Sequence, residues 1–168
     1  MENRKIRVGI THGDINGVGY EVILKTFSDP TMLELCTPVV YGSPKVAAYH
    51  RKAMEIQTSF SIVTSAEEVQ DGRVNVVNCL EEELKVELTK PTSEAGKTAL
   101  AALERALADY REGLFDVLVT APINKHTIQS DAFHFPGHTE YIEERVGEGQ
   151  KALMILLKGD FRVALVTG

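Results

Sequence analysis

Short apolar, β-branched runs alternate along the chain with segments whose apolar residues recur at helical spacing. The runs predict strands at residues 6–10, 38–41, 59–63, 74–79, 86–88, 115–119, 152–157 and 161–166. The helical patterns predict helices at residues 19–26, 44–54 and 139–146, and a long helix after Pro91. This alternation favours an α/β fold with a mostly parallel sheet and flanking helices. The last two strands favour an antiparallel pair, because Gly159 suits a tight turn between them.

Local signals define the ends of the predicted helices. Ser43 is expected to cap the helix that opens at Pro44, and Thr92 or Ser93 is expected to cap the long helix. Gly113 is expected to end the long helix. One apolar face of that helix is predicted from Leu100, Leu103, Leu107 and Tyr110. The first strand barely alternates, which predicts that both of its faces are buried.

Composition narrows the class of protein. The 168 residues are 43% hydrophobic and 25% charged, with a net charge of −6, as in globular chains of about one domain or slightly more. No basic run is present for binding nucleic acid, and no apolar stretch reaches membrane-spanning length. The apolar run near the N-terminus is too short to be the hydrophobic region of a signal peptide. We therefore expect a cytoplasmic protein with two free thiols, Cys36 and Cys79.

The first segment with candidate chemistry is the glycine-rich loop at residues 11–19, which follows the first predicted strand. Its spacing, G-x-x-x-G-x-G, matches neither the dinucleotide fingerprint nor the phosphate loop. Such a turn can present backbone N–H groups to an anion. Alternatively, the glycines serve only the geometry of a tight turn.

The second segment, residues 120–126, leaves the carboxyl end of a predicted buried strand, where open parallel sheets bind ligands. Lys125 in this loop can hold a phosphate or a carboxylate. The alternative is a solvated lysine on a surface loop.

The third segment surrounds His138. His134 and His138 are four residues apart, as in helical metal sites, but Pro136 and Gly137 between them would keep the two rings off one helix face. We expect instead that His138 and Thr139 lie at a helix N-terminus and face a ligand. The alternative is that Thr139 only caps the helix.

The other histidines have no partner that the sequence reveals. His12 and His126 cannot be assigned, and His50 is expected on the surface of its helix. No Ser-His-Asp order and no paired-carboxylate arrangement is evident.

Taken together, the three segments resemble the PdxA family, the 4-hydroxythreonine-4-phosphate dehydrogenases of vitamin B6 biosynthesis. The family's first loop, Thr-x-Gly-Asp-Pro-Ala-Gly-Ile-Gly-Pro-Glu, is similar to residues 11–21. Its Thr-Ala/Gly-Pro-x-x-Lys segment is matched by residues 120–125, and Phe-x-Gly-His-Thr-Glu by residues 135–140. The start of the long helix at residues 93–96 is similar too.

Three residues of the first loop depart from the family pattern. Ile15, Asn16 and Tyr20 stand where the family usually has Pro, Ala and Pro. The resemblance otherwise runs through the whole chain.

The resemblance implies a fold like that of isocitrate and isopropylmalate dehydrogenases and a homodimer with active sites between subunits. It implies that NAD accepts hydride from the secondary alcohol of 4-phosphohydroxy-L-threonine, a small phosphorylated hydroxy amino acid. The resulting β-keto acid then loses CO2 to give 3-amino-2-oxopropyl phosphate. A divalent metal ion (Zn, Mg or Co) held by three histidines acts as a Lewis acid in the family.

The family's site residues carry over only in part. His138 and Thr139 match its substrate-binding pair, and Lys125 matches a lysine that we assign to the substrate site. The family's first metal-binding histidine follows the strand matched by residues 161–167, so no residue of this chain is assigned as a metal ligand. The residues that contact NAD are not assigned.

The final apolar run also has no polar ending, although such a strand needs a neighbour to cover it. We therefore expect residues 1–168 to be the N-terminal part of a longer dehydrogenase, inactive alone. Two alternatives stay open: a non-catalytic module that binds phosphorylated ligands, and a related dehydrogenase of four-carbon sugar acid phosphates. Titration with phosphorylated hydroxy acids separates the binding module from the enzyme part.

Overall fold

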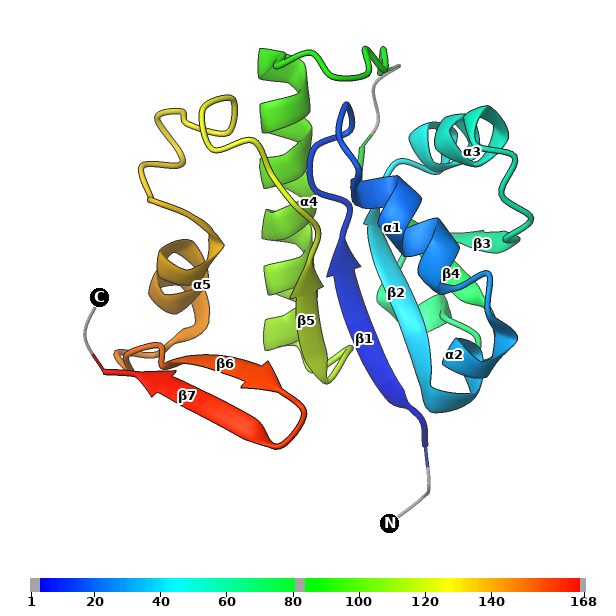
Figure 1. Ribbon diagram of the computed structural model, residues 1–168. Helices are drawn as coiled ribbons and strands as arrows, with labels where there is room; N and C mark the ends of the chain where they lie inside the picture. The colour runs from blue at the N-terminus through cyan, green and yellow to red at the C-terminus, as the bar shows by residue number, and fades with distance from the viewer. Residues whose placement is uncertain (1–3, 81–83, 167–168) are drawn as a thin grey trace. The chain divides into compact units, whose positions relative to one another are not determined.

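The computed structural model describes residues 4–80 and 84–166. The chain divides into two compact units, residues 1–134 and 135–168, and each is described by itself. The first unit is a parallel sheet with helices on both faces (Figure 1). Its strands are β1 (Ile6–Thr11), β2 (Cys36–Gly42), β3 (Phe60–Val63), β4 (Val74–Asn78) and β5 (Val117–Thr120). Its helices are α1 (Gly19–Thr26), α2 (Pro30–Leu35), α3 (Pro44–Ala53), α4 (Ser93–Arg111) and a 3₁₀ turn, η1 (Ala66–Glu68).

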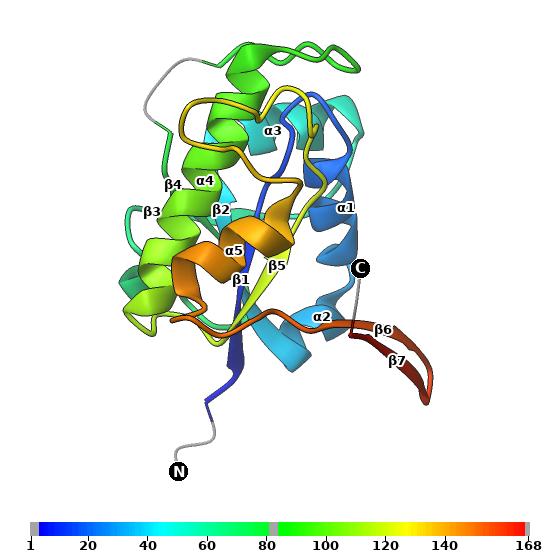
Figure 2. The same ribbon diagram turned by 90° about the vertical axis from the view of Figure 1, so that its left-hand side faces the viewer.

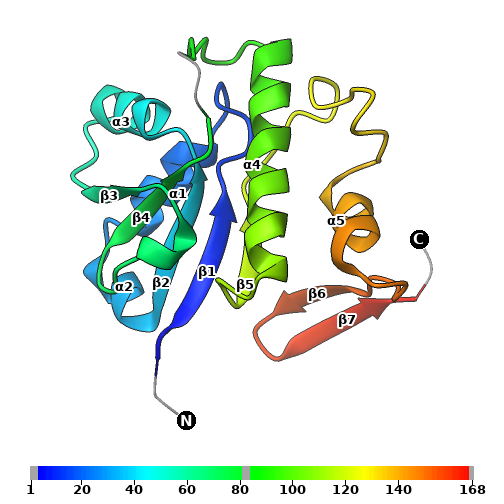
Figure 3. The same cartoon turned by 180° about the vertical axis from the view of Figure 1, so that it is seen from behind.

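The five strands lie in the order β3-β4-β2-β1-β5, and every neighbouring pair is parallel. In the register, Ile10 lies between Val40 and Val119. The predicted mostly parallel sheet is therefore confirmed. Figure 2 shows β1 and β5 between α1 on one side and α4 on the other. In Figure 3, which shows the chain from behind, α4 lies nearer the viewer than the sheet.

Alternation along the central strands divides the core into two layers. On one face, Ile10, Val40 and Val76 belong to a buried cluster with residues of α1 and α3. On the other face, Tyr41 and Val77 pack in a cluster that includes alanines of α4. Because successive side chains of a strand point to opposite faces, β2 and β4 each contribute residues to both layers.

The predicted helix ends are confirmed. The Ser43 hydroxyl accepts the N–H of Val46 at 3.3 Å at the start of α3. Thr92 caps α4 by accepting the N–H of Ala95 at 3.2 Å. Gly113 follows the end of α4 with φ +72°, a conformation that favours glycine.

Several sequence-based predictions were wrong. Residues 86–88 form no strand and belong instead to a turn-containing segment between β4 and α4. The first strand is not buried throughout, since Ile6 is 56% exposed. Tyr110 is 40% exposed, so the apolar face of α4 ends before it. Helix α2 was missed, although Asp29 caps it by accepting the N–H of Thr31 at 2.9 Å ahead of a proline at its first position.

The second unit contains helix α5 (His138–Val146) and a hairpin of β6 (Met154–Lys158) and β7 (Phe161–Leu165). The two strands are antiparallel, as predicted, and Gly159 turns between them with φ +58°. The hairpin exposes large apolar side chains on both strands, among them Leu157 at 67% and Phe161 at 70%. Within residues 4–80 and 84–166, no helix combines the length and apolar character needed to cross a bilayer.

Candidate functional site

The sheet order places a topological switch point between β1 and β5. The chain leaves β1 towards β2 on one side, whereas β4 leads through α4 to β5 on the other side. Ligands of open parallel sheets bind outside the carboxyl ends of strands at such a point. The glycine-rich loop follows β1 and the loop with Lys125 follows β5, so both predicted segments of the first unit lie at this edge.

The two loops pack directly against one another. The N–H of Asp14 donates to the carbonyl of Pro122 at 2.9 Å, and the N–H of Ala121 donates to that of Thr11 at 3.1 Å. Gly13 has φ +73°, and a Cβ atom there would lie 2.3 Å from the Pro122 carbonyl oxygen. Gly13 is therefore required by backbone geometry and close approach.

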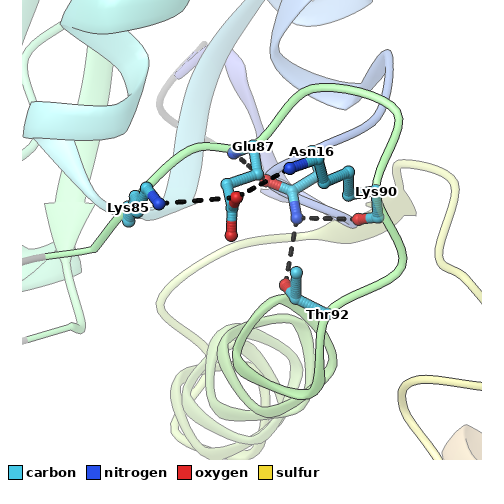
Figure 4. Close-up of polar contacts among 5 residues, drawn as sticks. All are labelled: Asn16, Lys85, Glu87, Lys90 and Thr92. Carbon is cyan, nitrogen blue, oxygen red and sulfur yellow. Dashed lines mark hydrogen bonds and ion pairs between the residues drawn. The ribbon is translucent and has the colours of Figure 1, made fainter.

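Asn16 joins the glycine loop to the segment between β4 and α4 (Figure 4). Its side-chain Oδ1 accepts the N–H of Glu87 at 2.7 Å, and its Nδ2 donates to the carbonyl of Lys90 at 2.9 Å and to the Thr92 hydroxyl at 3.0 Å. The Asn16 side chain is almost fully buried, at 3% exposure. Sequence reasoning missed this role, although Asn16 departs from the family pattern.

His12, the residue after β1, is fully buried. Its Nε2 donates to the carbonyl of Thr98 on α4 at 3.2 Å, and its ring stacks on that of Tyr20. Burial lowers the pKa of His12 to about 4, with a smaller lowering from nearby His50. The ring is thus neutral, and its Nδ1 and the buried Thr11 hydroxyl have no hydrogen-bond partner among the described residues.

The prediction that His50 lies on the surface was wrong. His50 is 3% exposed, its Nε2 donates to the carbonyl of Ile15 at 2.8 Å, and its ring stacks on Tyr20. The Tyr20 hydroxyl in turn accepts the N–H of Ser43 at 2.8 Å and donates to its carbonyl. The three rings hold the glycine loop to the start of α3.

Lys125 is exposed on the loop after β5. Asn124 orders this loop, because its Oδ1 accepts the N–H of His126 at 3.0 Å. Gly96 of α4 packs against the same loop, since a Cβ atom there would lie 1.8 Å from the Thr127 carbonyl oxygen. The predicted position of Lys125 at the carboxyl edge is confirmed, whereas its role in substrate binding stays a prediction.

His138 and Thr139 open helix α5 in the second unit. The N-cap residue is Gly137, with no side-chain cap, so the alternative that Thr139 caps the helix was wrong. The positive end of the helix dipole lies at this first turn, where it favours a negatively charged group. Thr139 also lines a hollow of about 410 Å³ within this unit, together with Ile142, Glu143 and residues 146–147 and 150–154.

A larger hollow, of about 660 Å³, lies between the end of α3 and the start of β3, where Arg51 and Lys52 are among its lining residues. Because β3 begins there, this hollow is at the amino edge of the sheet. Ligand sites of open parallel sheets lie at the opposite, carboxyl edge. This hollow is therefore not the candidate site, although it is the larger of the two.

No metal centre is found in the described part of the chain. Among residues 4–80 and 84–166, no group of three His, Cys, Asp or Glu side chains is placed to hold a metal ion. Both cysteines are free thiols, as predicted. Burial raises the pKa of Cys79 to about 12, so its thiol is protonated at neutral pH.

Comparison with known proteins gives a consistent picture. The family described as "Pyridoxal phosphate biosynthetic protein PdxA" matches residues 34–168. A 4-hydroxythreonine-4-phosphate dehydrogenase of Bacteroides thetaiotaomicron is 74% identical over 99% of this chain and 46% of its own length. A putative D-threonate 4-phosphate dehydrogenase of Oceanobacillus iheyensis is 30% identical over 91% of this chain and 47% of its own length.

Solved structures agree with the sequence matches. The crystal structure of a 4-hydroxythreonine-4-phosphate dehydrogenase from Burkholderia phymatum superposes with a TM-score of 0.82 at 26% identity, over 96% of this chain and 49% of that one. The chain thus spans about half the length of the curated relatives it matches.

Proposed function

The chain belongs to the PdxA family, and from that premise we propose that it forms part of a 4-hydroxythreonine-4-phosphate dehydrogenase. In the proposed reaction, the secondary alcohol of 4-phosphohydroxy-L-threonine loses a hydride to NAD and its hydroxyl proton to a base. The β-keto acid then loses CO2, which leaves 3-amino-2-oxopropyl phosphate. The observation that carries the proposal is the 74% identity with the Bacteroides dehydrogenase over almost the whole chain.

His138 and Thr139 are proposed to bind the substrate. A ring N–H and a hydroxyl at the uncapped start of α5 are suitable donors to an anionic or hydroxyl oxygen. The hollow that Thr139 lines gives its hydroxyl access to a small molecule.

Lys125 is proposed to offset the negative charge of the substrate. Its ammonium group is exposed on an ordered loop at the switch point of the sheet. Lysine binds phosphate as a point charge, which needs proximity but no fixed fork geometry.

The divalent metal ion that the family implies does not fit the described residues, because they offer no cluster of three ligands. In the proposal its ligands come from the part of the dehydrogenase that this chain does not match, and no step is assigned to it here. NAD accepts the hydride when it is bound, but the glycine loop lacks the dinucleotide fingerprint and no NAD contact is assigned.

A homodimer is proposed as the assembled state, in a cytoplasmic setting. The β6–β7 hairpin supports self-association, because both strands expose large apolar side chains. An isolated two-stranded hairpin is at best marginally stable, so such side chains favour a covering partner.

A hybrid enzyme tests the proposed function. Residues 1–168 replace the matching segment of the Bacteroides dehydrogenase, and NADH formation is measured with 4-phosphohydroxy-L-threonine. We expect turnover by the hybrid and none by the 168-residue chain alone, because the described residues present no metal cluster. A folded but inactive hybrid would refute the proposal.

D-threonate 4-phosphate is the second candidate substrate, because the Oceanobacillus relative carries that activity in its name. The two candidates differ at the amino group of the amino acid. The same hybrid assay with both substrates decides between them, and we expect the higher kcat/KM with 4-phosphohydroxy-L-threonine.

A further inference from the structure

We propose that Asn16 is a positioning residue whose hydrogen bonds hold the turn at residues 87–90 beside the glycine loop. This set of hydrogen bonds is called the Asn16 grip. The positioning role rests on the proposed function, because the glycine loop lies at the switch point where the substrate is expected. The hydrogen bonds of the grip are observed between described residues and do not depend on that function.

Three of the four turn residues bond to Asn16. Its Oδ1 accepts the N–H of Glu87 at 2.7 Å, its backbone carbonyl accepts the N–H of Thr89 at 2.9 Å, and its Nδ2 donates to the carbonyl of Lys90 at 2.9 Å. Nδ2 also donates to the hydroxyl of Thr92, the cap of α4. One side chain therefore ties the glycine loop, the turn and the start of α4 together (Figure 4).

The gripped turn is strained. The N–H of Lys90 donates to the carbonyl of Glu87 at 3.0 Å, which closes a four-residue turn. Thr89, the third residue, has φ +67°, where such turns favour glycine and a β-branched residue is an outlier. Strained residues of this kind persist only where surrounding contacts hold them, and they gather at ligand clamps and switch regions.

The surface charges do not account for the grip. Glu87 pairs with Lys90 at 3.1 Å and with Lys85 at 3.4 Å, but both lysine side chains are largely exposed. Exposed ion pairs of this kind contribute little to stability, whereas leaving buried amide partners unsatisfied is costly. The buried Asn16 amide is therefore the stronger holding element.

The side-chain bonds of the grip come from the amide group of Asn16. The alanine that the family usually carries there keeps only the backbone bond to Thr89.

Hydrogen exchange on the 168-residue chain tests the grip. Asn16→Ala is expected to speed exchange of the Glu87 and Thr89 amides roughly tenfold while the β2 and β4 amides keep their protection. Thr89→Gly in the same background is expected to restore part of the protection, because glycine removes the strain. Glu87→Ala, which breaks only the ion pairs, is the matched control and should change little.

Two exchange results would overturn the grip: Asn16→Ala leaving the turn amides unchanged, or Glu87→Ala loosening them as much. Equal acceleration in the turn and the core strands would likewise show a general loss of stability in place of a local grip.

The positioning role is tested in the hybrid enzyme. Asn16→Ala should raise KM several-fold and leave kcat within a factor of about two, and the added Thr89→Gly should bring KM back. Unchanged KM would overturn the positioning role. An inactive hybrid without any substitution would sink the proposed function instead, and the exchange result would still stand.

Discussion

The rings of His12 and Tyr20 stack with centroids 5.4 Å apart and an angle of 14° between their planes. The Tyr20 ring also stacks on the ring of His50, with the two centroids 5.5 Å apart. The stack joins the residue that follows β1 to helices α1 and α3. It depends on a neutral His12, because a charged imidazolium in this buried position would lack water and a counter-charge.

Stability is expected to fall in mild acid because of His12. Its pKa is about 4 in the folded chain against 6.5 as the ordinary value, so between these values the unfolded chain binds the extra proton. Stability is then fully present above about pH 6.5 and is lost as the pH falls towards 4, by on the order of 3 kcal/mol. Urea unfolding at a series of pH values measures this loss.

His12→Phe is the matched variant for that measurement. Phenylalanine keeps the stack on Tyr20 and cannot titrate, so the variant should show a flatter dependence of unfolding free energy on pH. The same steep loss in both proteins between pH 6.5 and 4.5 would contradict the assignment to His12.

Gly96→Ala is expected to destabilise the chain, although alanine favours helices. A Cβ atom at Gly96 would overlap the Thr127 carbonyl, so α4 must move away from the loop after β5 at a cost of about 1–3 kcal/mol. The control is Gly17→Ala, whose Cβ atom would meet its nearest neighbour at 3.5 Å. Thermal unfolding of both variants distinguishes overlap from a general effect of alanine.

Tyr41→Phe is expected to cost about 1–3 kcal/mol in unfolding free energy. The Tyr41 hydroxyl donates to the Asp109 carboxylate at 2.9 Å, and Asp109 is only 4% exposed. Arg105 keeps one contact with that carboxylate at 2.9 Å, so the loss is partial. Tyr49→Phe changes a 44% exposed ring and should be near neutral in the same urea titration.

The chain is expected to self-associate through the β6–β7 hairpin. Light scattering over a range of concentrations should show a rise in mass that Phe161→Lys reduces, because Phe161 is 70% exposed on β7. Leu35→Lys is the control, since Leu35 is 69% exposed at the end of α2. Equal effects of the two substitutions would place the association elsewhere.

Much of the fold could be predicted from the sequence because its signals are local. Helix α1 and the caps Ser43 and Thr92 follow from spacing and residue type alone. The positions of Lys125 and His138 followed from the elements beside them. The strand predicted at residues 86–88 does not form, because hydrogen bonds from the distant glycine loop hold this short apolar pattern in another conformation.

The contacts of the site could not be predicted, because they join residues far apart in the chain. His12 reaches Thr98, and His50 reaches Ile15, through the packing of helices against the sheet. Nothing in the local sequence of either histidine indicates burial. For the contacts around the glycine loop, the sequence offered one signal: Asn16 is a polar residue where the family usually has alanine.

The most direct test of the central claim is the effect of His138→Ala on kcat/KM of the hybrid dehydrogenase with 4-phosphohydroxy-L-threonine and NAD. His134→Ala is the matched control, since His134 is an exposed histidine four residues earlier. We predict a loss of about a hundredfold or more for His138→Ala and little change for His134→Ala. Equal activity of the two variants would contradict the assignment of the substrate site to the start of α5.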